Sequence, residues 1–219
     1  MSLQHTLDAF KKNFEAGGPP YNAPEWIHEP MHRATAELIA SGAAERAAKV
    51  GNKAPAFSLR DPDGDEVSST ELLSQGPLVV SFYPYCNMDL QALQAALPMF
   101  EEHGAKLVAI SPQTAANSRR SRRENNLTFP ILSDPHNEVA AAFGLRFKLP
   151  DYLIDLYRNV FKNDLAVING DPSWTLPMPA RFVIAQDGTI LYAEVSPHYT
   201  RRPDPAELLS ALRGLRAAA

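Results

Sequence analysis

The chain has 219 residues, of which 45% are hydrophobic and 21% charged, with a formal net charge of −4. These values are typical of one globular domain with room for a small appendage. A single cysteine excludes secreted disulfide scaffolds and cysteine-rich zinc modules, and its unpaired thiol indicates a reducing cytosol. The negative charge argues against a nucleic-acid binder, and no apolar run is long enough for a membrane span or a signal peptide. We therefore expect a cytoplasmic protein that binds neither nucleic acid nor membranes.

The start of the chain predicts a helical extension. Apolar residues recur at helical spacing over residues 3–16, and a cluster of glycine and proline ends that helix. A second helix is predicted from Pro30 towards Ala48. We expect residues 1–45 to form this extension and residues 46–219 to form the main domain. The apolar face of the extension requires a partner, either the body of the same chain or a second subunit, so a homodimer is one hypothesis.

Beyond the extension, predicted strands and helices alternate along the chain. The apolar or β-branched segments predict strands at residues 56–59, 78–83, 106–110 and 129–132. Helical spacing and capping residues predict helices at residues 89–103, 115–125, 135–144 and 149–162. A hairpin of residues 181–185 and 189–195 precedes a last helix over residues 205–215. This order predicts an α/β fold, in which helices cover both faces of a mixed central sheet.

The single cysteine lies where an α/β sheet usually places its chemistry. Ligands bind at the carboxyl ends of the central strands, and the predicted strand that ends at Tyr83 is followed directly by Pro84, Tyr85 and Cys86. Cys86 would begin the next helix, whose free backbone N–H groups and dipole favour a thiolate. A structural interpretation stays open, because Cys86 also continues the apolar stripe of that helix and free cysteines are often buried.

Several segments in a constant order carry a resemblance to a known family. They are residues 50–57 (VGNKAPAF), 76–83 (GPLVVSFY), 109–112 (AISP), 130–134 (PILSD), 182–184 (FVI) and 187–190 (DGTI). Together they resemble the alkyl hydroperoxide reductase and thiol-specific antioxidant (AhpC/TSA) family, the peroxiredoxins, which implies a thioredoxin-like fold. The resemblance covers about residues 46–216, and the helical extension is similar to that of a peroxiredoxin-like bacterial subgroup.

The sequence departs from the subgroup at its central motif. Members usually carry Trp-Cys-Pro-x-Cys between the strand and the helix, and the first of these cysteines attacks. Here Tyr83 is followed directly by Pro84, Tyr85 and Cys86, so Cys86 matches only the second, resolving cysteine. Two interpretations stay open. The protein has lost its attacking cysteine, or a short loop that carries it is missing from the printed sequence.

The resemblance implies a thiol-dependent peroxidase or disulfide oxidoreductase that needs no cofactor. A thiolate reduces a hydroperoxide and becomes a sulfenic acid, which a thiol reductant such as a thioredoxin or glutathione clears. In the complete motif Cys86 is the resolving thiol, whereas in the printed sequence it must attack by itself. The alternative is a non-catalytic thioredoxin-fold protein that binds a partner through its N-terminal helices.

Two further site candidates follow from the resemblance. Pro179 resembles the thioredoxin-fold proline that lies against the active-site cysteines, and its preceding peptide bond is expected to be cis. A proline that starts an edge strand is the alternative. Arg181 is a candidate for the arginine that stabilises transition-state charge in peroxiredoxins, because it lies close to Pro179 in the sequence. An ordinary surface position on the strand is equally compatible with the pattern.

Two other motifs are expected to be structural. His28-Glu29-Pro30-Met31-His32 spells the H-E-x-x-H zinc signature, which requires both histidines on one continuous helix. Because Pro30 is expected to begin the helix, we expect no metal site there. The basic run at residues 119–123 is expected to be a solvated helix face rather than a nucleic-acid site.

Overall fold

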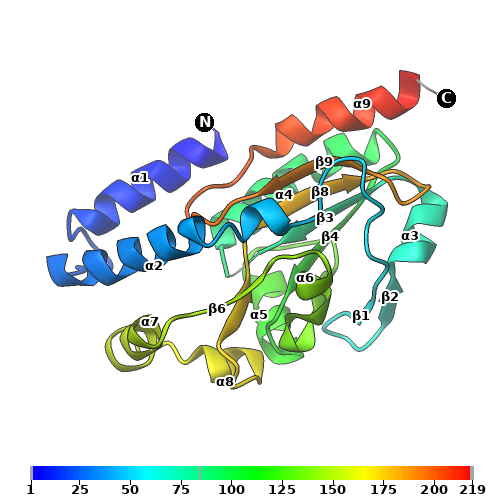
Figure 1. Cartoon of the computed structure of the whole chain (residues 1–219). Coiled ribbons are helices and arrows are strands. Elements are labelled where there is room, and N and C mark those ends of the chain that lie inside the picture. The colour runs from blue at the N-terminus through cyan, green and yellow to red at the C-terminus, as the bar shows by residue number, and fades with distance from the viewer. Residues whose placement is uncertain (1, 84, 218–219) are drawn as a thin grey trace.

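A seven-stranded mixed sheet forms the centre of the computed structural model, which describes residues 2–83 and 85–217 (Figure 1). The strands are β1 Ser58–Arg60, β2 Glu66–Ser68, β3 Leu78–Phe82, β4 Lys106–Ser111, β5 Ile131–Ser133, β6 Arg146–Lys148, β7 Thr175–Pro177, β8 Ala180–Ile184 and β9 Ile190–Val195. The order in the sheet is β2-β1-β5-β4-β3-β8-β9, while β6 and β7 pair separately. Strands β3, β4 and β5 are parallel, and the β8–β9 hairpin joins β3 in the antiparallel sense.

Helices cover the sheet and also form the start and end of the described chain. The α-helices are α1 Leu3–Glu15, α2 His28–Ala40, α3 Ser69–Gln75, α4 Asn87–Glu101, α5 Ala115–Glu124, α6 Glu138–Ala142, α7 Asp151–Asp155, α8 Leu165–Asn169 and α9 Leu209–Ala217. Short 3-10 turns are η1 Glu25–Ile27, η2 Ala44–Arg46, η3 Pro135–Asn137 and η5 Pro205–Leu208, and η4 Leu156–Val160 is a π-helical turn. None of the helices in the described residues combines the length and apolar character needed to cross a membrane. The predicted arrangement, a mixed sheet flanked by helices, is confirmed.

Local differences from the predicted elements have physical causes. Helix α2 begins at His28 rather than at Pro30, because η1 leads directly into it and proline is tolerated in a first helical turn. It ends at Ala40, before Gly42 with a φ of 64°, and so does not reach Ala48. The helix predicted over residues 149–162 is α7 followed by the π-helical turn η4. Elements β2, α3, β6, β7 and α8 were not predicted.

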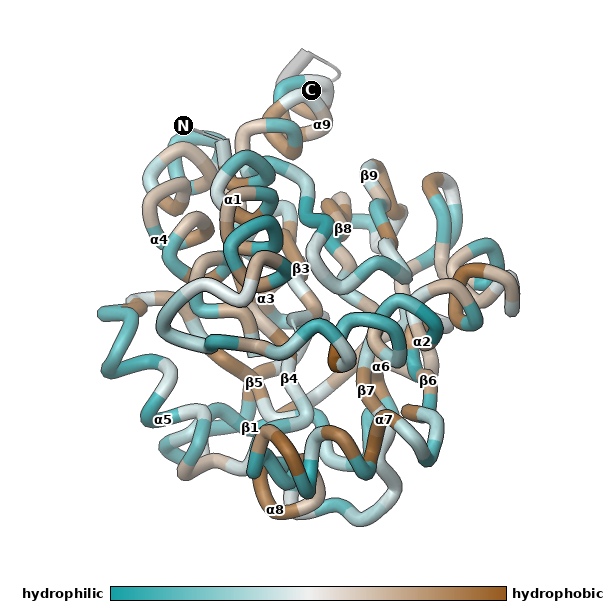
Figure 2. Tube along the Cα trace, turned by 90° about the vertical axis from the view of Figure 1, so that its left-hand side faces the viewer, coloured by the Kyte–Doolittle hydropathy of each residue, from teal (hydrophilic) through white to brown (hydrophobic). Residues whose placement is uncertain are grey.

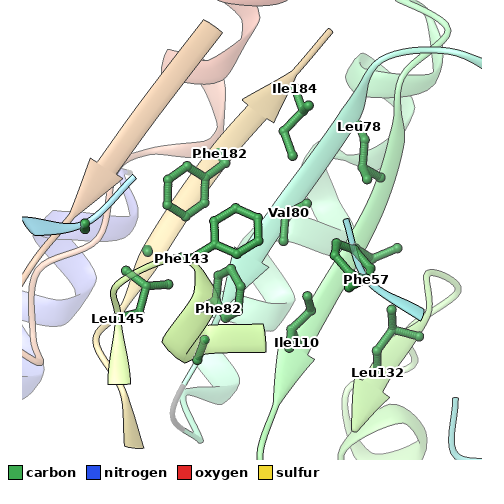
Figure 3. Close-up of a cluster of buried hydrophobic side chains, with 14 of the residues drawn as sticks. Phe57, Leu78, Val80, Phe82, Ile110, Leu132, Phe143, Leu145, Phe182 and Ile184 are labelled. Carbon is green, nitrogen blue, oxygen red and sulfur yellow. The ribbon is translucent and has the colours of Figure 1, made fainter. Parts of the chain in front are cut away.

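The sheet separates two hydrophobic clusters. On one face, the rings of Phe82, Phe143 and Phe182 meet with centroids 5.0 to 6.1 Å apart (Figure 3). On the other face, α4 and α9 pack on the sheet through buried leucines that include Leu93 and Leu212. All five residues of β3 are buried, as expected for a central strand covered on both faces. Because both clusters bury β3, the end of this strand has a fixed position, and Cys86 follows shortly after it in the chain.

A third cluster joins the N-terminal helices to the segment that carries α7 and α8. Ile27 of η1 is buried with Leu153 of α7 and with Trp174, and Tyr85 packs against this cluster. On α1, Leu3 is 6% and Leu7 is 3% exposed, so this part of the apolar face is covered by its own chain, whereas Phe10 and Phe14 are half-buried. A second subunit is therefore not needed to bury these two leucines. The homodimer and the division of the chain at residues 45 and 46 stay predictions.

Candidate functional site

Cys86 is the N-cap residue of α4, directly after the buried strand β3. Its backbone is extended, with φ −93° and ψ 102°, and its carbonyl accepts a hydrogen bond from the Leu90 N–H at 3.2 Å. The Cys86 side chain makes no capping hydrogen bond, but the nearby backbone N–H groups of Met88 and Asp89 lower the pKa of the thiol and so favour its ionised form. This is the junction between strand and helix that the sequence predicted for the cysteine.

Burial nevertheless dominates the ionisation of this thiol. It raises the pKa of Cys86, since a thiolate loses solvation in a low-dielectric environment. The charge of Arg202 and the backbone N–H groups lower that pKa in part, whereas the carboxylate of Asp89 raises it further. The reactivity of Cys86 therefore depends on the balance between burial and a small number of nearby charges.

Those charges belong to a buried ion network that begins in the first turn of α4, at Asp89. Asp89 is 0%, Arg181 1% and Arg202 5% exposed. Asp89 Oδ1 accepts from Arg181 Nη2, and Arg202 Nε lies 3.5 Å from Asp89 Oδ2. Because two guanidinium groups share one carboxylate, the network carries an excess positive charge. Such an excess favours an anion, and the Cys86 thiol is a nearby group that can become one.

The structure corrects the interpretation of Arg181 as a surface strand residue. Arg181 pairs with Ser81 of β3 in the middle of the sheet, and its Nη1 donates to the Pro203 carbonyl at 2.6 Å. A charged side chain is tolerated at this depth because Asp89 supplies the opposite charge. Arg181 thus connects β8, α4 and the segment before η5. Its catalytic role stays a prediction.

The peptide bond before Pro179 is trans, so the prediction of a cis bond there is wrong. The described cis bond is Pro19–Pro20, in the loop after α1. Trans is the lower-energy isomer of an X–Pro bond. Neighbouring hydrogen bonds also hold the passage from β7 to β8, since the Met178 N–H donates to Leu145 O at 2.9 Å and Pro179 O accepts from the Ser196 N–H at 2.9 Å. Pro179 is buried in this connection.

The two tyrosines beside Cys86 are anchored in different parts of the molecule. The buried Tyr83 donates to Gln113 Oε1 at 3.2 Å, and Tyr85 donates to Asn169 Oδ1 at 2.6 Å. Burial raises the pKa of both phenols, so both remain neutral donors. Tyr85 has a φ of 62°, which is unusual for an aromatic residue. The predicted loop residue Pro84 lies outside the described residues.

Sequence reasoning missed the two partners that set the charge of the site. Asp89 lies in the first turn of α4, where acidic residues are common, so nothing in the pattern indicates its burial. Arg202 lies in an irregular segment between β9 and η5, and no periodicity marks it. Asn169, the partner of Tyr85, lies 84 positions away in α8, which was not predicted.

The remaining motifs have structural partners. His28 and His32 do lie on one helix, but His32 Nε2 is 2.7 Å from Glu15 Oε1. Within residues 2–83 and 85–217, no three His, Cys, Asp or Glu side chains are placed to hold a metal ion. In the basic run, Arg119 donates to the Pro62 carbonyl, and Arg122 binds both carboxylate oxygens of Asp63 at 2.7 and 3.0 Å. Helix α5, which carries this run, is largely hydrophilic (Figure 2).

Comparison with known proteins assigns the family. The sequence pattern of the AhpC/TSA family matches residues 50–193. The chain belongs to the AhpC/TSA family. Over 99 residues, this AhpC/TSA protein is 38% identical to a putative peroxiredoxin of Mycobacterium tuberculosis strain H37Rv, covering 43% of this chain and 62% of the relative. The chloroplastic peroxiredoxin Q of Oryza sativa subsp. japonica is 34% identical over 100 residues, which are 43% of this chain and 46% of the relative.

A solved structure extends the similarity of this AhpC/TSA protein beyond those segments. The crystal structure of the peroxidoxin BcpB from Mycobacterium tuberculosis matches with a TM-score of 0.60 at 25% identity, over 78% of this chain and 98% of that chain. The predicted thioredoxin-like fold and the resemblance to the peroxiredoxins are therefore confirmed. The chain spans less than two thirds of the length of the two curated relatives, at 62% and 46%.

Proposed function

We propose that this AhpC/TSA protein is a thiol-dependent peroxidase in which Cys86 attacks the peroxide. The observation that carries the proposal is the position of Cys86 at the N-cap of α4, where the N–H groups of Met88 and Asp89 and the charge of Arg202 favour the thiolate. The relatives that are named as peroxiredoxins support the same reaction class.

The proposed reaction uses one protein thiol. The Cys86 thiolate attacks one peroxide oxygen, an S–O bond forms as the O–O bond breaks, and the leaving oxygen takes a proton to give an alcohol or water. An external thiol then displaces water from the sulfenic acid, and a second external thiol releases Cys86 and leaves with the first as a disulfide. Because the sequence holds one cysteine, the reductant supplies both thiols. A thioredoxin or glutathione in a reducing cytosol fits this requirement.

The buried arginines supply the electrostatic part of the proposal. Negative charge develops on the leaving oxygen as the O–O bond breaks, and preorganised positive groups stabilise such charge. Arg202 is the arginine whose charge reaches Cys86, and Arg181 is joined to it through Asp89. We assign Arg202 to the stabilisation of charge at the thiol, with Arg181 as the group that holds Asp89 in place.

A second candidate function is a binding module without catalysis. It is favoured by one observation, the burial that raises the pKa of the Cys86 thiol and lowers its thiolate fraction at neutral pH. In that case the partner would bind through the N-terminal helices.

Peroxide-dependent oxidation of Cys86 separates the two functions. The reduced protein would be treated with hydrogen peroxide or cumene hydroperoxide and a sulfenic-acid trap such as dimedone, and the adduct located by mass spectrometry. Turnover would be followed with a thioredoxin system and with glutathione. We expect an adduct on Cys86 and turnover that is lost in Cys86→Ser. Peroxide consumption at the same rate in Cys86→Ser would exclude the peroxidase and favour the binding module.

The mass of the protein made from its native gene tests the identity of the nucleophile. A mass that matches the printed sequence leaves Cys86 as the single available thiol. A mass larger by a short loop, with a second alkylatable cysteine, would assign the attack to that cysteine and resolution to Cys86.

A further inference from the structure

The first turn of α1 is hydrogen-bonded to residues 196–204, the irregular segment between β9 and η5, here called the fastened segment. Gln4 Nε2 donates to Thr200 O at 3.2 Å, and Gln4 Oε1 accepts from the Arg202 N–H at 3.1 Å. The Leu3 N–H donates to Asp204 Oδ2 at 3.2 Å. Figure 1 shows the blue start of α1 near the red-orange segment that leads to α9. Two segments that lie 196 to 201 positions apart in the sequence therefore share hydrogen bonds at this place.

The fastened segment carries the contacts of both buried arginines. Arg202 belongs to it, and its Nη1 donates to the carbonyls of Tyr199 and Arg201 at 2.7 and 2.8 Å. The Pro203 carbonyl accepts from Arg181 Nη1 at 2.6 Å. The segment lies between β9 and η5 and belongs to neither element. Its backbone lacks the ladder of hydrogen bonds that holds a strand, so contacts with neighbouring side chains fix its position.

We propose that Gln4 is a positioning residue for the Cys86 site, because its amide holds the backbone at Thr200 and Arg202 and so keeps the Arg202 guanidinium beside Asp89. The inference rests on the proposed thiol chemistry of Cys86 and gives the N-terminal extension a role in it. Burial of Leu3 and Leu7 attaches α1 to the protein whether or not the amide is present. The hydrogen bonds of the Gln4 side-chain amide additionally fix the position of the Arg202 backbone relative to α1.

The consequence for the thiol follows from the charges around it. The groups involved are Asp89 from α4, Arg181 from β8, Arg202 and Asp204 from the fastened segment, and Asp8 of α1, whose carboxylate accepts from Gln4 Nε2 at 2.8 Å. Arg202 is the cation that stabilises the thiolate of Cys86, and Asp89 opposes ionisation. If Arg202 moves away, the excess positive charge near the sulfur decreases and ionisation of the thiol becomes harder.

The test compares Gln4→Ala with His5→Ala, a substitution at an exposed position in the same turn of α1. The readout is the pH midpoint of Cys86 alkylation by iodoacetamide in the full-length protein. We expect Gln4→Ala to raise the midpoint by about half a pH unit, which is about a threefold change in the ionisation constant. His5→Ala should match the wild type. Equal midpoints for Gln4→Ala and His5→Ala would overturn the proposal.

A double-substitution cycle tests whether Gln4 acts through Arg202. In Arg202→Met, Asp89 keeps Arg181 as its counter-charge, so the buried charges balance. Adding Gln4→Ala to this background should leave the midpoint unchanged. A half-unit rise that persists in the Arg202→Met background would overturn the inference. Alkylation needs no peroxide, so absence of peroxidase turnover would defeat the proposed function without affecting this result.

Discussion

Asp89 and Arg181 form a buried ion pair between residues 92 positions apart, and neither side chain is more than 1% exposed. Asp89 lies three residues after Cys86 at the start of α4, whereas Arg181 lies in β8 next to the central strand β3. The pair therefore ties the helix that carries the thiol to the sheet. Removing one member of such a pair leaves the other charge buried without compensation.

We expect Asp89→Asn to lower the free energy of unfolding by about 3 kcal/mol, because the amide leaves two buried guanidinium groups without a counter-charge. Urea denaturation would measure the change. Asp65→Asn is the matched control, since Asp65 is exposed, and it should change stability by less than about 0.5 kcal/mol. Similar unfolding midpoints for the two variants would contradict the prediction.

Two substitutions at the ion network should move the pKa of Cys86 in opposite directions. Asp89→Asn removes a negative charge that raises the thiol pKa, so the midpoint of the pH dependence of alkylation should fall. Arg202→Met removes the positive charge that lowers it, so the midpoint should rise. In the wild-type protein the midpoint should lie above about 8.5, the value of a free thiol, because burial raises the pKa. Shifts of the same sign in both variants would be inconsistent with the network.

Tyr85→Phe should destabilise the protein by about 1 kcal/mol, since it removes the hydrogen bond to Asn169 and leaves the amide oxygen unpaired while keeping the ring. Tyr152→Phe is the control, because the Tyr152 hydroxyl bonds the exposed carboxylate of Glu37 at 2.7 Å. A smaller loss is expected for the control, as water replaces that bond. Thermal or urea unfolding of both variants would measure the difference, and a larger loss in Tyr152→Phe would count against a stabilising role for the part-buried Tyr85 hydroxyl.

Asp187 should titrate well below an ordinary aspartate. The Thr189 N–H at 2.9 Å and the Lys53 ammonium at 3.0 Å lower its pKa to about 2. A carboxylate whose folded pKa is depressed contributes stability above its unfolded pKa of about 3.9, and that contribution is lost as the pH falls towards 2. Lys53→Ala should raise the Asp187 pKa part of the way towards the value of an ordinary aspartate, because the hydrogen bond from Thr189 remains. NMR titration would measure it, with Lys106→Ala as a control that should leave it unchanged.

The sequence by itself determined the features that depend on local pattern. A continuous apolar run predicted the buried strand β3, and helical spacing predicted α4 within two residues at each end. The Asp-Gly turn predicted the β8–β9 hairpin, and ordered short motifs predicted the family. Together they placed Cys86 between a central strand and a helix start. Local pattern suffices here because these features arise between residues that are neighbours in the chain.

Only the tertiary structure decided how charge is arranged around that thiol. Asp89, Arg181 and Arg202 come from a helix, a strand and an irregular segment. Arg181 was a candidate from the resemblance, but its burial and its pairing with Asp89 were not predicted, and nothing in the sequence pattern marked Asp89 or Arg202. The sequence pattern also did not predict the trans bond before Pro179 or the contact of Gln4 with Arg202. These features depend on pairings across tens to hundreds of positions, which no local periodicity encodes. They exist because buried charges and peptide groups are stabilised by the partners that packing brings near, and those partners can come from any part of the chain.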